Sequence, residues 1–426
     1  MKSAYIGLVF FAIYIAGVSS TVSNAVISIS SAVVLLYTIY DYRQHKLSFP
    51  VPGADLQFVW WLFFIALILD SLFLADAEAV KKALDYLYLS LPFWLLLAFY
   101  YHHPKVRYFG GGVAAALIFE GLYSVYVFFF VNHMEHVRVE TFAANLNGFG
   151  TIIAMSLPFT CALVAANYRE NKWVTAGFVV SSILGLAALV LTGSRGAMLG
   201  FGVGCVVLVL AKLLLLGIRS HVKSVFFGLI ICSLIVGGFA FTMGNFHRDT
   251  DNQRILFVKS SIAMWRDHPI LGVGLTNWKE QYHSRYKLPQ AFEKEISMPH
   301  NTVAFFFSTT GLLGGISFLI FTFGIFIYLC KYMRKQPDNF LIRAMLWSFV
   351  ALSVHGLVDA GLTMRTALRL YSAYMGVTVA SILKYEAEEV AKLYGEKTAI
   401  TSNYYRKQRF YGYRIAHKKS EEEGFR

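Results

Sequence analysis

The chain has 426 residues, of which 57% are hydrophobic and only 15% are charged, and its formal net charge is +13. This composition, with a mean hydropathy of +0.54, gives more apolar surface than a water-soluble fold of this length needs. In a soluble protein the charge would suggest nucleic acid as a partner. Here Lys and Arg collect in short connections and in the C-terminal tail, so we expect membrane lipids as the surroundings and no nucleic acid.

The apolar residues fall into runs that are close to the length needed to cross a hydrocarbon core of about 30 Å. We therefore predict an all-α, polytopic membrane protein of about twelve transmembrane helices. The first run lacks a sizeable charged n-region and a clear cleavage site, so we interpret it as a span and not as a signal peptide. The predicted runs lie near residues 4–18, 24–40, 57–75, 84–100, 109–131, 147–167, 174–192, 196–217, 224–243, 302–330, 341–359 and 367–383.

The charges of the connections predict how these spans are oriented. With the N-terminus inside, every cytoplasmic connection holds at least two Lys or Arg, whereas the short external connections are poorer in positive charge. Both termini are then cytoplasmic. The predicted division is nine spans in residues 1–243, an external loop in 244–300, three spans in 301–384 and a basic cytoplasmic tail in 385–426.

The external loop at 244–300 is the one long connection. Apolar residues recur at spacings of three and four in its first part, which predicts an amphipathic helix from Asn252 to Asp267, ended by His268-Pro269. After a glycine turn, the spacing of Trp278, Tyr282 and Tyr286 predicts a second short helical segment that lies against the bilayer interface.

The cysteines give no sign of a metal or disulfide site. They all fall inside apolar segments without ligand spacing, so we predict packing roles for them. The chain has no phosphate-binding glycine loop of the Walker type, no dinucleotide fingerprint and no Asp-rich motif, and we expect neither a metal nor a cofactor. The four are Cys161, Cys205, Cys232 and Cys330.

Arg195 is the first candidate for chemistry. It lies in Leu191-Thr-Gly-Ser-Arg-Gly-Ala197, between two apolar runs, where Ser194 is positioned to cap the helix that Arg195 opens. A helix N-terminus with a guanidinium group suits a phosphate. The alternative is an arginine that extends from a helix end to the lipid headgroups.

Arg254 and Arg266 lie on the predicted helix of the external loop. Arg254 shares a face with Trp265, so the helix can be anchored at one end and present Arg254 at the other. Arg266 falls about 120° away around the helix and is the weaker candidate. Either arginine can also be an ordinary solvated charge.

His300 precedes a long apolar run in Met298-Pro-His-Asn-Thr302, so we expect it at a helix N-terminus on the outer face. A helix N-terminus disfavours the imidazolium, which would leave His300 able to accept a proton from an attacking hydroxyl. A structural histidine is the alternative. Asn301, beside it, is a possible substrate ligand.

Two further groups of polar residues are open to more than one interpretation. His355 and Asp359 are four residues apart in a predicted span and can pair, either as a proton relay of a carrier or as a structural hydrogen bond. Arg138, with Asn145 and Asn147, is expected on the outer face. There it can bind sugar hydroxyls or a phosphate, or it can belong to a loop that caps the start of a helix.

Taken in order, these motifs resemble the O-antigen ligase and polymerase superfamily. The similarity covers most of residues 140–360, including the large external loop before the last spans. No single motif is specific, but together they are specific for the superfamily. The motifs are Leu191-Thr-Gly-Ser-Arg-Gly-Ala-Met-Leu-Gly200, Gln253-Arg-Ile-Leu256, Trp265-Arg-Asp-His-Pro-Ile-Leu-Gly-Val-Gly274, Pro299-His-Asn301 and Gly311-Leu-Leu-Gly314.

The resemblance implies a metal-independent, inverting glycosyltransferase of the bacterial inner membrane, with its active site facing the periplasm. It implies an undecaprenyl-diphosphate-linked glycan as donor and, for a ligase, a sugar hydroxyl of lipid A-core as acceptor. Carried over to this chain, Arg195 and Arg254 would bind the diphosphate and His300 would act on the acceptor hydroxyl.

Three rival functions remain at this point. A polymerase would extend lipid-linked repeat units, and we favour the ligase because the chain has a single long external loop. A related enzyme would transfer the glycan onto protein. A transporter or flippase of lipid-linked sugars would also need intramembrane charges, but it would not need a histidine at the outer mouth of the site.

Overall fold

The computed structural model describes residues 2–21, 24–133, 139, 146–167, 171–216, 251–292, 296–359 and 361–393. Across these residues the chain forms α-helices joined by turns and short π or 3-10 segments, without a strand. Eight of the helices are long and apolar enough to cross a membrane, and α1 and α13 are shorter apolar helices. The all-α, polytopic membrane fold is therefore confirmed.

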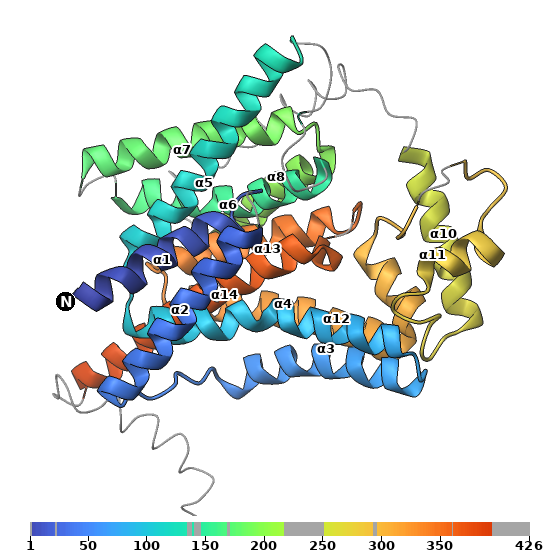
Figure 1. Ribbon diagram of the computed structural model, residues 1–426, viewed down its shortest axis with the longest axis horizontal. Helices are drawn as coiled ribbons and strands as arrows, with labels where there is room; N and C mark the ends of the chain where they lie inside the picture. Colours follow the sequence, from blue (N-terminus) through green and yellow to red (C-terminus); the bar gives the residue numbers. More distant parts are fainter. Residues whose placement is uncertain are drawn as a thin grey trace, which may run out of the picture.

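Each predicted apolar run coincides with a helix, except the run at 224–243, which lies outside the described residues. Cys232 and most of the basic tail lie outside them as well. The helices, labelled in Figure 1, are α1 (Lys2–Val18), α2 (Asn24–His45), α3 (Ala54–Phe73), α4 (Ala77–His102), α5 (Val106–Tyr126), α6 (Leu146–Asn167), α7 (Lys172–Leu191), α8 (Arg195–Leu216), α10 (Asp251–Asp267), α11 (Trp278–Gln281), α12 (Thr302–Lys335), α13 (Phe340–His355) and α14 (Arg365–Leu393).

Some helices are longer than their apolar runs. α4 begins at Ala77, seven residues before the predicted span, because the Asp76 side chain accepts hydrogen bonds from the backbone N–H groups of Glu78 and Ala79, both at 3.0 Å. α14 continues to Leu393, beyond the predicted end of the last span at residue 383. Hydropathy alone places neither boundary, because both extensions carry charged residues.

The long helices form a bundle in which α14 packs along α4, α12 along α3, α5 along α7, and α13 against both α6 and α8. In Figure 1 the segments α10 and α11 lie together at one end of this bundle, and the N-terminus lies toward the other. The described residues of 251–300, predicted as the external loop and called the external segment below, therefore form a cap over one end of the helices.

An aromatic cluster of Trp60, Phe93, Phe321 and Tyr371 holds α3, α4, α12 and α14 together. The Trp60 ring stacks on Phe93 at a centroid distance of 4.2 Å and lies 5.8 Å from Phe321 and 6.2 Å from Tyr371. All four side chains are buried. Because lipid tails are as apolar as these rings, their close packing, and not burial from water, stabilises the cluster.

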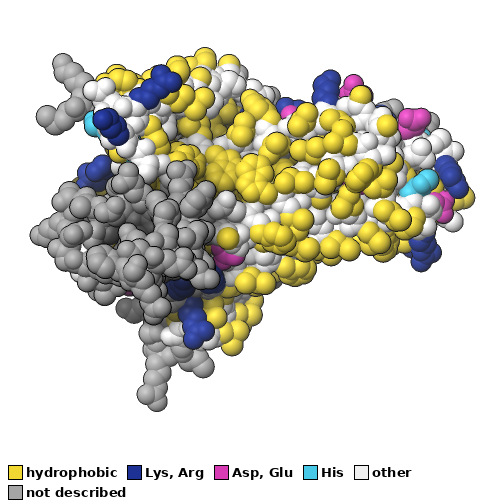
Figure 2. Space-filling model, turned by 90° about the horizontal axis from the view of Figure 1, so that it is seen from below, with side chains coloured by type: hydrophobic (Ala, Val, Ile, Leu, Met, Phe, Trp, Pro, Cys, Tyr) yellow, Lys and Arg dark blue, Asp and Glu magenta, His cyan; other side chains and the backbone are white. Residues whose placement is uncertain are grey.

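The outer surface of the bundle is apolar. Figure 2 shows hydrophobic side chains covering much of the visible face, with charged side chains toward both ends, one of which carries α10 and α11. Exposed Phe58, Leu72, Phe73, Phe323 and Ile327 on α3 and α12 belong to this kind of surface. It suits contact with lipid tails between two polar interfaces.

Candidate functional site

The turn between α7 and α8 places Arg195 as predicted. α7 ends at Leu191, the Ser194 N–H donates to Thr192 Oγ1 at 3.0 Å, and α8 begins with Arg195. The Ser194 carbonyl accepts the Met198 N–H at 3.0 Å, the first bond of the helix. The arginine thus opens a transmembrane helix, whose positive dipole end favours an anion.

α10 carries Arg254 and matches the predicted amphipathic helix to within one residue. It packs against α12, the helix that follows His300. At its far end Trp265 donates through Nε1 to the Pro269 carbonyl at 3.2 Å and meets the Phe307 ring edge to face at 5.0 Å. The predicted anchoring of this helix by Trp265 is therefore to α12.

A break in α12 fixes the position of the external segment. Around Thr310 and Gly311 the backbone leaves helical geometry, and Gly311 has φ +54°. The freed groups pair with residues 269–274: Val273 and Gly274 N–H donate to the Ser308 and Thr309 carbonyls at 2.9 Å, and Leu312 N–H donates to Pro269 O at 2.8 Å. These bonds explain why a glycine-rich motif follows α10.

Only glycine fits at the two points where these chains cross. A Cβ on Gly311 would lie 2.2 Å from the Ile270 carbonyl oxygen, and a Cβ on Gly272, which has φ +64°, would lie 2.4 Å from the Thr309 backbone. Gly272 and Gly311 therefore join the external segment to α12 and hold α10 over the start of that helix.

His300 occupies a left-handed conformation (φ +50°) directly before α12. The chain beside it is tied to the end of α13: Asn301 Nδ2 donates to Leu357 O at 2.7 Å, and Thr302 N–H donates to Gly356 O at 2.7 Å. Asn301 Oδ1 accepts the Ala304 N–H at 2.8 Å as the helix cap. Asn301 thus holds the start of α12 through both polar groups, and its contact with substrate stays a prediction.

Asp359 connects the predicted site residues and was not among them. Its side chain is 5% exposed, Oδ1 lies 3.2 Å from His300 Nδ1, and Oδ2 lies 3.7 Å from Arg254 Nη2. Sequence reasoning considered Asp359 only as a partner of His355. The available signal was an acidic residue in an apolar stretch, but its partners are far away along the chain.

His355 and Asp359 pair as predicted, but they do not share one helix. α13 ends at His355, because Gly356 begins a turn, and Asp359 lies beyond the helix. The two side chains approach to 4.0 Å between His355 Nε2 and Asp359 Oδ2. His355 Nδ1 lies 2.7 Å from Thr151 Oγ1 on α6, a buried contact that joins α13 to α6.

A pocket of about 450 Å³ brings together Arg195, Arg254 and His300. Sequence reasoning missed a further cation here, Lys259, which lies five residues after Arg254 on α10. Three cationic side chains and the histidine thus line the pocket, and Asp359 lies behind them. The apolar residues that line the pocket are Leu199, Ile255, Val258, Leu357 and Val358.

The pocket can therefore accept an amphipathic anion. Guanidinium and ammonium groups converge from two helices, as phosphate binding requires. The aliphatic side chains beside them suit a hydrocarbon chain attached to the phosphate. His300 lines the same pocket, and its Nδ1 is engaged with Asp359, so Nε2 is the ring nitrogen available to a substrate.

The remaining predicted residues lie elsewhere. Arg266 is exposed and is twelve residues from Arg254, about 18 Å along α10, so it does not line the pocket. Arg138 and Asn145 lie outside the described residues.

The aromatic residues of the external segment do not lie against the bilayer as predicted. Trp278, Tyr282 and Tyr286 are buried, and Trp278 Nε1 donates to Ser261 Oγ of α10 at 2.9 Å. Burial and the hydrogen bond to Asp267 raise the pKa of Tyr286. These rings form a small core that supports α10 through Phe257 and Ser261, because buried aromatics with polar atoms need partners that lipid lacks.

Comparison with known proteins gives one family. Residues 180–319 match the family model described as O-antigen ligase. The matched range contains Arg195, Arg254, Lys259 and His300, and it ends before Asp359. No curated protein matches the chain.

Proposed function

Because residues 180–319 carry the domain of the O-antigen ligase superfamily, whose members act on lipid-linked glycans, we propose that this protein is an O-antigen ligase. It transfers a glycan from undecaprenyl diphosphate to a sugar hydroxyl of lipid A-core at the periplasmic face of the inner membrane. The observation that carries this proposal is the convergence of Arg195, Arg254 and His300 on one pocket.

The two arginines act on the leaving group. As the bond between the sugar C1 and the phosphate oxygen breaks, negative charge builds up on the diphosphate. Arg195 and Arg254 supply planar donors for these oxygens without a metal ion, and Lys259 adds a third positive charge at the pocket rim. The aliphatic side chains of the pocket hold the first isoprene units of the carrier.

His300 acts on the acceptor. Asp359 Oδ1 accepts a hydrogen bond from the Nδ1–H group, which leaves the Nε2 lone pair directed away from Asp359. Nε2 takes the proton of the acceptor hydroxyl while its oxygen bonds to C1, and the undecaprenyl diphosphate departs from the opposite face of the sugar. The configuration at C1 is therefore inverted.

Asp359 also places the two halves of the site relative to each other. It contacts the histidine that acts on the acceptor and lies near the Arg254 guanidinium that binds the donor. One buried carboxylate thus fixes the distance between the groups on which the proposed reaction depends.

Reconstitution in liposomes tests the proposal. The purified protein receives an undecaprenyl-diphosphate-linked glycan and lipid A-core, and transfer is followed by the mobility of the lipid A product. Glycan joined to lipid A-core supports a ligase. Glycan joined only to a second lipid-linked unit identifies a polymerase, and translocation of the intact donor identifies a flippase.

Two arginines on α10 provide a matched pair of variants. Arg254→Gln should lower transfer by about 10²-fold or more, in the range found for removal of one donor that stabilises a developing anion. Arg266→Gln, on the same helix but outside the pocket, should transfer glycan like the wild type. Equal activity of the two variants would remove Arg254 from the site.

A further inference from the structure

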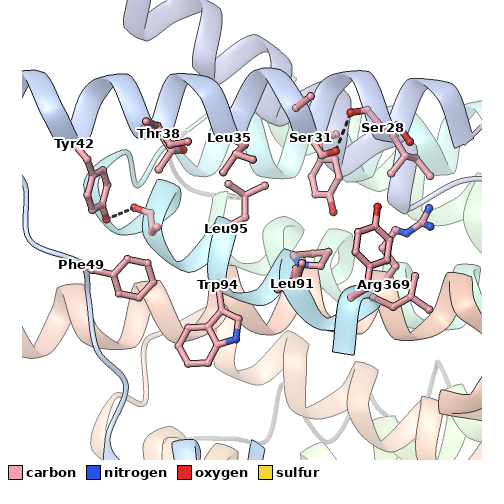
Figure 3. Close-up of a pocket in the computed structure, with 18 of the residues that line it drawn as sticks. Ser28, Ser31, Leu35, Thr38, Tyr42, Phe49, Leu91, Trp94, Leu95 and Arg369 are labelled. Carbon is pink, nitrogen blue, oxygen red and sulfur yellow. Dashed lines mark hydrogen bonds between the residues drawn. The ribbon is translucent and has the colours of Figure 1, made fainter. Parts of the chain in front are cut away.

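A second hollow of about 800 Å³ lies between α2 and α4 and shares no lining residue with the pocket of Arg195. Figure 3 shows α2 on one side and Leu91, Trp94 and Leu95 of α4 on the other. Residues of α1, α14 and the connection after α2 complete its lining. We call this hollow the α2–α4 groove.

The groove opens to the hydrocarbon region. Leu35, near its middle, is 47% exposed, and Leu91 and Tyr88 on α4 are also exposed. Its lining is mainly apolar, and some of its polar side chains bond within the protein: Ser31 Oγ donates to Ser28 O at 2.9 Å and Tyr42 OH donates to Ala98 O at 3.2 Å. Such a lining suits a hydrocarbon chain.

The length of the groove indicates the kind of chain. Its α2 residues run from Ser28 to Arg43, a rise of about 22 Å along the helix. One leaflet accounts for half of a hydrocarbon core of about 30 Å, or about 15 Å. The groove is therefore longer than an acyl chain of one leaflet and suits a polyprenyl chain.

A positive charge marks the outer end of the groove. Arg369 lies one turn into α14, opposite Tyr42 and Phe49 at the other end (Figure 3). It donates to Asn24 Oδ1 at 3.1 Å, and within the described part of the chain no carboxylate forms an ion pair with it, whereas nearby Arg365 pairs with Asp85 at 2.9 Å. A cation at the end of an apolar groove in a membrane attracts a phosphate.

We propose that the α2–α4 groove binds a polyprenyl phosphate, with the chain along α2 and α4 and the phosphate at Arg369. The inference builds on the proposed function, which assigns the protein a polyprenyl carrier as substrate. It adds a second carrier-lipid site, separate from the pocket in which the glycan is transferred. Arg43, at the inner end, belongs to the positively charged cytoplasmic side.

Photolabelling tests this site without any glycan transfer. A C55 polyprenyl phosphate with a diazirine in its chain is incorporated with the full-length protein into phosphatidylglycerol nanodiscs, irradiated, and the labelled peptides are identified by mass spectrometry. We expect label on Ser28–Arg43 and Tyr88–Ala98, displaced by unlabelled polyprenyl phosphate. A diazirine phosphatidylglycerol that labels these peptides equally well in competition would overturn the proposal in favour of ordinary bilayer lipid.

Variants on α2 and α14 sharpen the test. Leu35→Trp fills the groove and should lower labelling at least fivefold, whereas Leu36→Trp, on the outward face of the same helix, should leave it unchanged. Arg369→Gln should lower labelling by the phosphate probe but not by the matching polyprenol, and Arg369→Lys should restore part of it. Unchanged labelling in both Leu35→Trp and Arg369→Gln would also overturn the proposal.

The two proposals fail separately. Arg254→Gln should label the groove normally, because Arg254 lines the other pocket. If the wild-type protein is labelled in the groove but transfers no glycan, the lipid site is supported and the ligase function is refuted. If it transfers glycan but is not labelled in the groove, the ligase function is supported and the lipid site is refuted.

Discussion

The aromatic cluster around Trp60 and the pocket around Asp359 are built in different ways. At the cluster, unbroken stretches of α3, α4, α12 and α14 pack through rings. At the pocket, α8 begins, α13 ends, α12 starts after a left-handed His300 and breaks ten residues on, and buried polar groups bridge the ends. Continuous helices thus form the packed bundle, which we call the frame, and helix ends provide the polar groups that can act in a reaction.

Replacement of His300 should show the difference between the two regions most clearly, because it should lower activity without lowering stability. His300→Ala removes the proposed base, and we expect transfer to fall by about 10²- to 10⁴-fold, because a positioned base contributes that much. The thermal unfolding midpoint should stay near that of the wild type. His268→Ala, an exposed histidine at the end of α10, is the control, and a comparable loss in both would argue against a specific role.

Asp359→Asn should give the next largest effect. The amide keeps the size of the side chain but presents a donor to His300 Nδ1 in one of its orientations, so the imidazole loses its fixed tautomer. We expect kcat to fall by about 10²-fold or more with a smaller change in KM for the acceptor. A loss confined to KM would mean that Asp359 serves binding only.

Gly311→Ala tests the link between the external segment and α12. The added Cβ meets the Ile270 carbonyl at 2.2 Å and disfavours φ +54°, so the segment and Arg254 must shift. A misplacement of about 1 Å can cost about 10²-fold, so we expect a loss of one to two orders of magnitude. Gly111→Ala on α5, where a Cβ meets nothing within 4 Å, should transfer normally.

Lys259→Gln should have a modest effect. The side chain is exposed, and a solvent-screened charge is worth up to about 1 kcal/mol, which corresponds to about a fivefold loss in kcat/KM. The loss should diminish with added salt. Lys279→Gln on α11, outside the pocket, is the matched control; a salt-independent loss would show that Lys259 acts through direct contact with the reacting groups.

Trp60→Ala should affect transfer least. It removes a fully buried ring, and truncations of this size cost roughly 3–5 kcal/mol in protein cores. The unfolding midpoint should therefore fall, while the folded fraction transfers glycan within about twofold of the wild type because Trp60 does not line the pocket. A large loss in the folded fraction would mean that the frame and the pocket are coupled.

The sequence was sufficient to predict the transmembrane helices and some of the residues that line the pocket. Apolar runs and charged connections predicted the helices, and α10 was predicted to within one residue because its periodicity is local. The motif residues Arg195, Arg254 and His300 were predicted to share a site, and they line one pocket.

What the sequence did not yield depends on contacts between distant segments. Asp359 was expected to pair with His355 on one continuous helix, but the turn at Gly356 also brings it to His300 and Arg254, far away along the chain. The inward packing of Trp278 on Ser261 has the same cause. Sequence spacing determines which residues share a helix face, but not which partner that face meets.

Binding of a polyprenyl diphosphate without glycan tests the central claim most directly. Its affinity is measured in nanodiscs for the wild type, Arg195→Gln, Arg254→Gln, Arg266→Gln and His300→Ala, with the groove filled by Leu35→Trp in every protein. Shared diphosphate binding predicts that Arg195→Gln and Arg254→Gln each lose at least tenfold in affinity, while Arg266→Gln and His300→Ala bind like the Leu35→Trp parent. Unchanged affinity in Arg195→Gln or Arg254→Gln would contradict the claim that the two arginines bind one diphosphate.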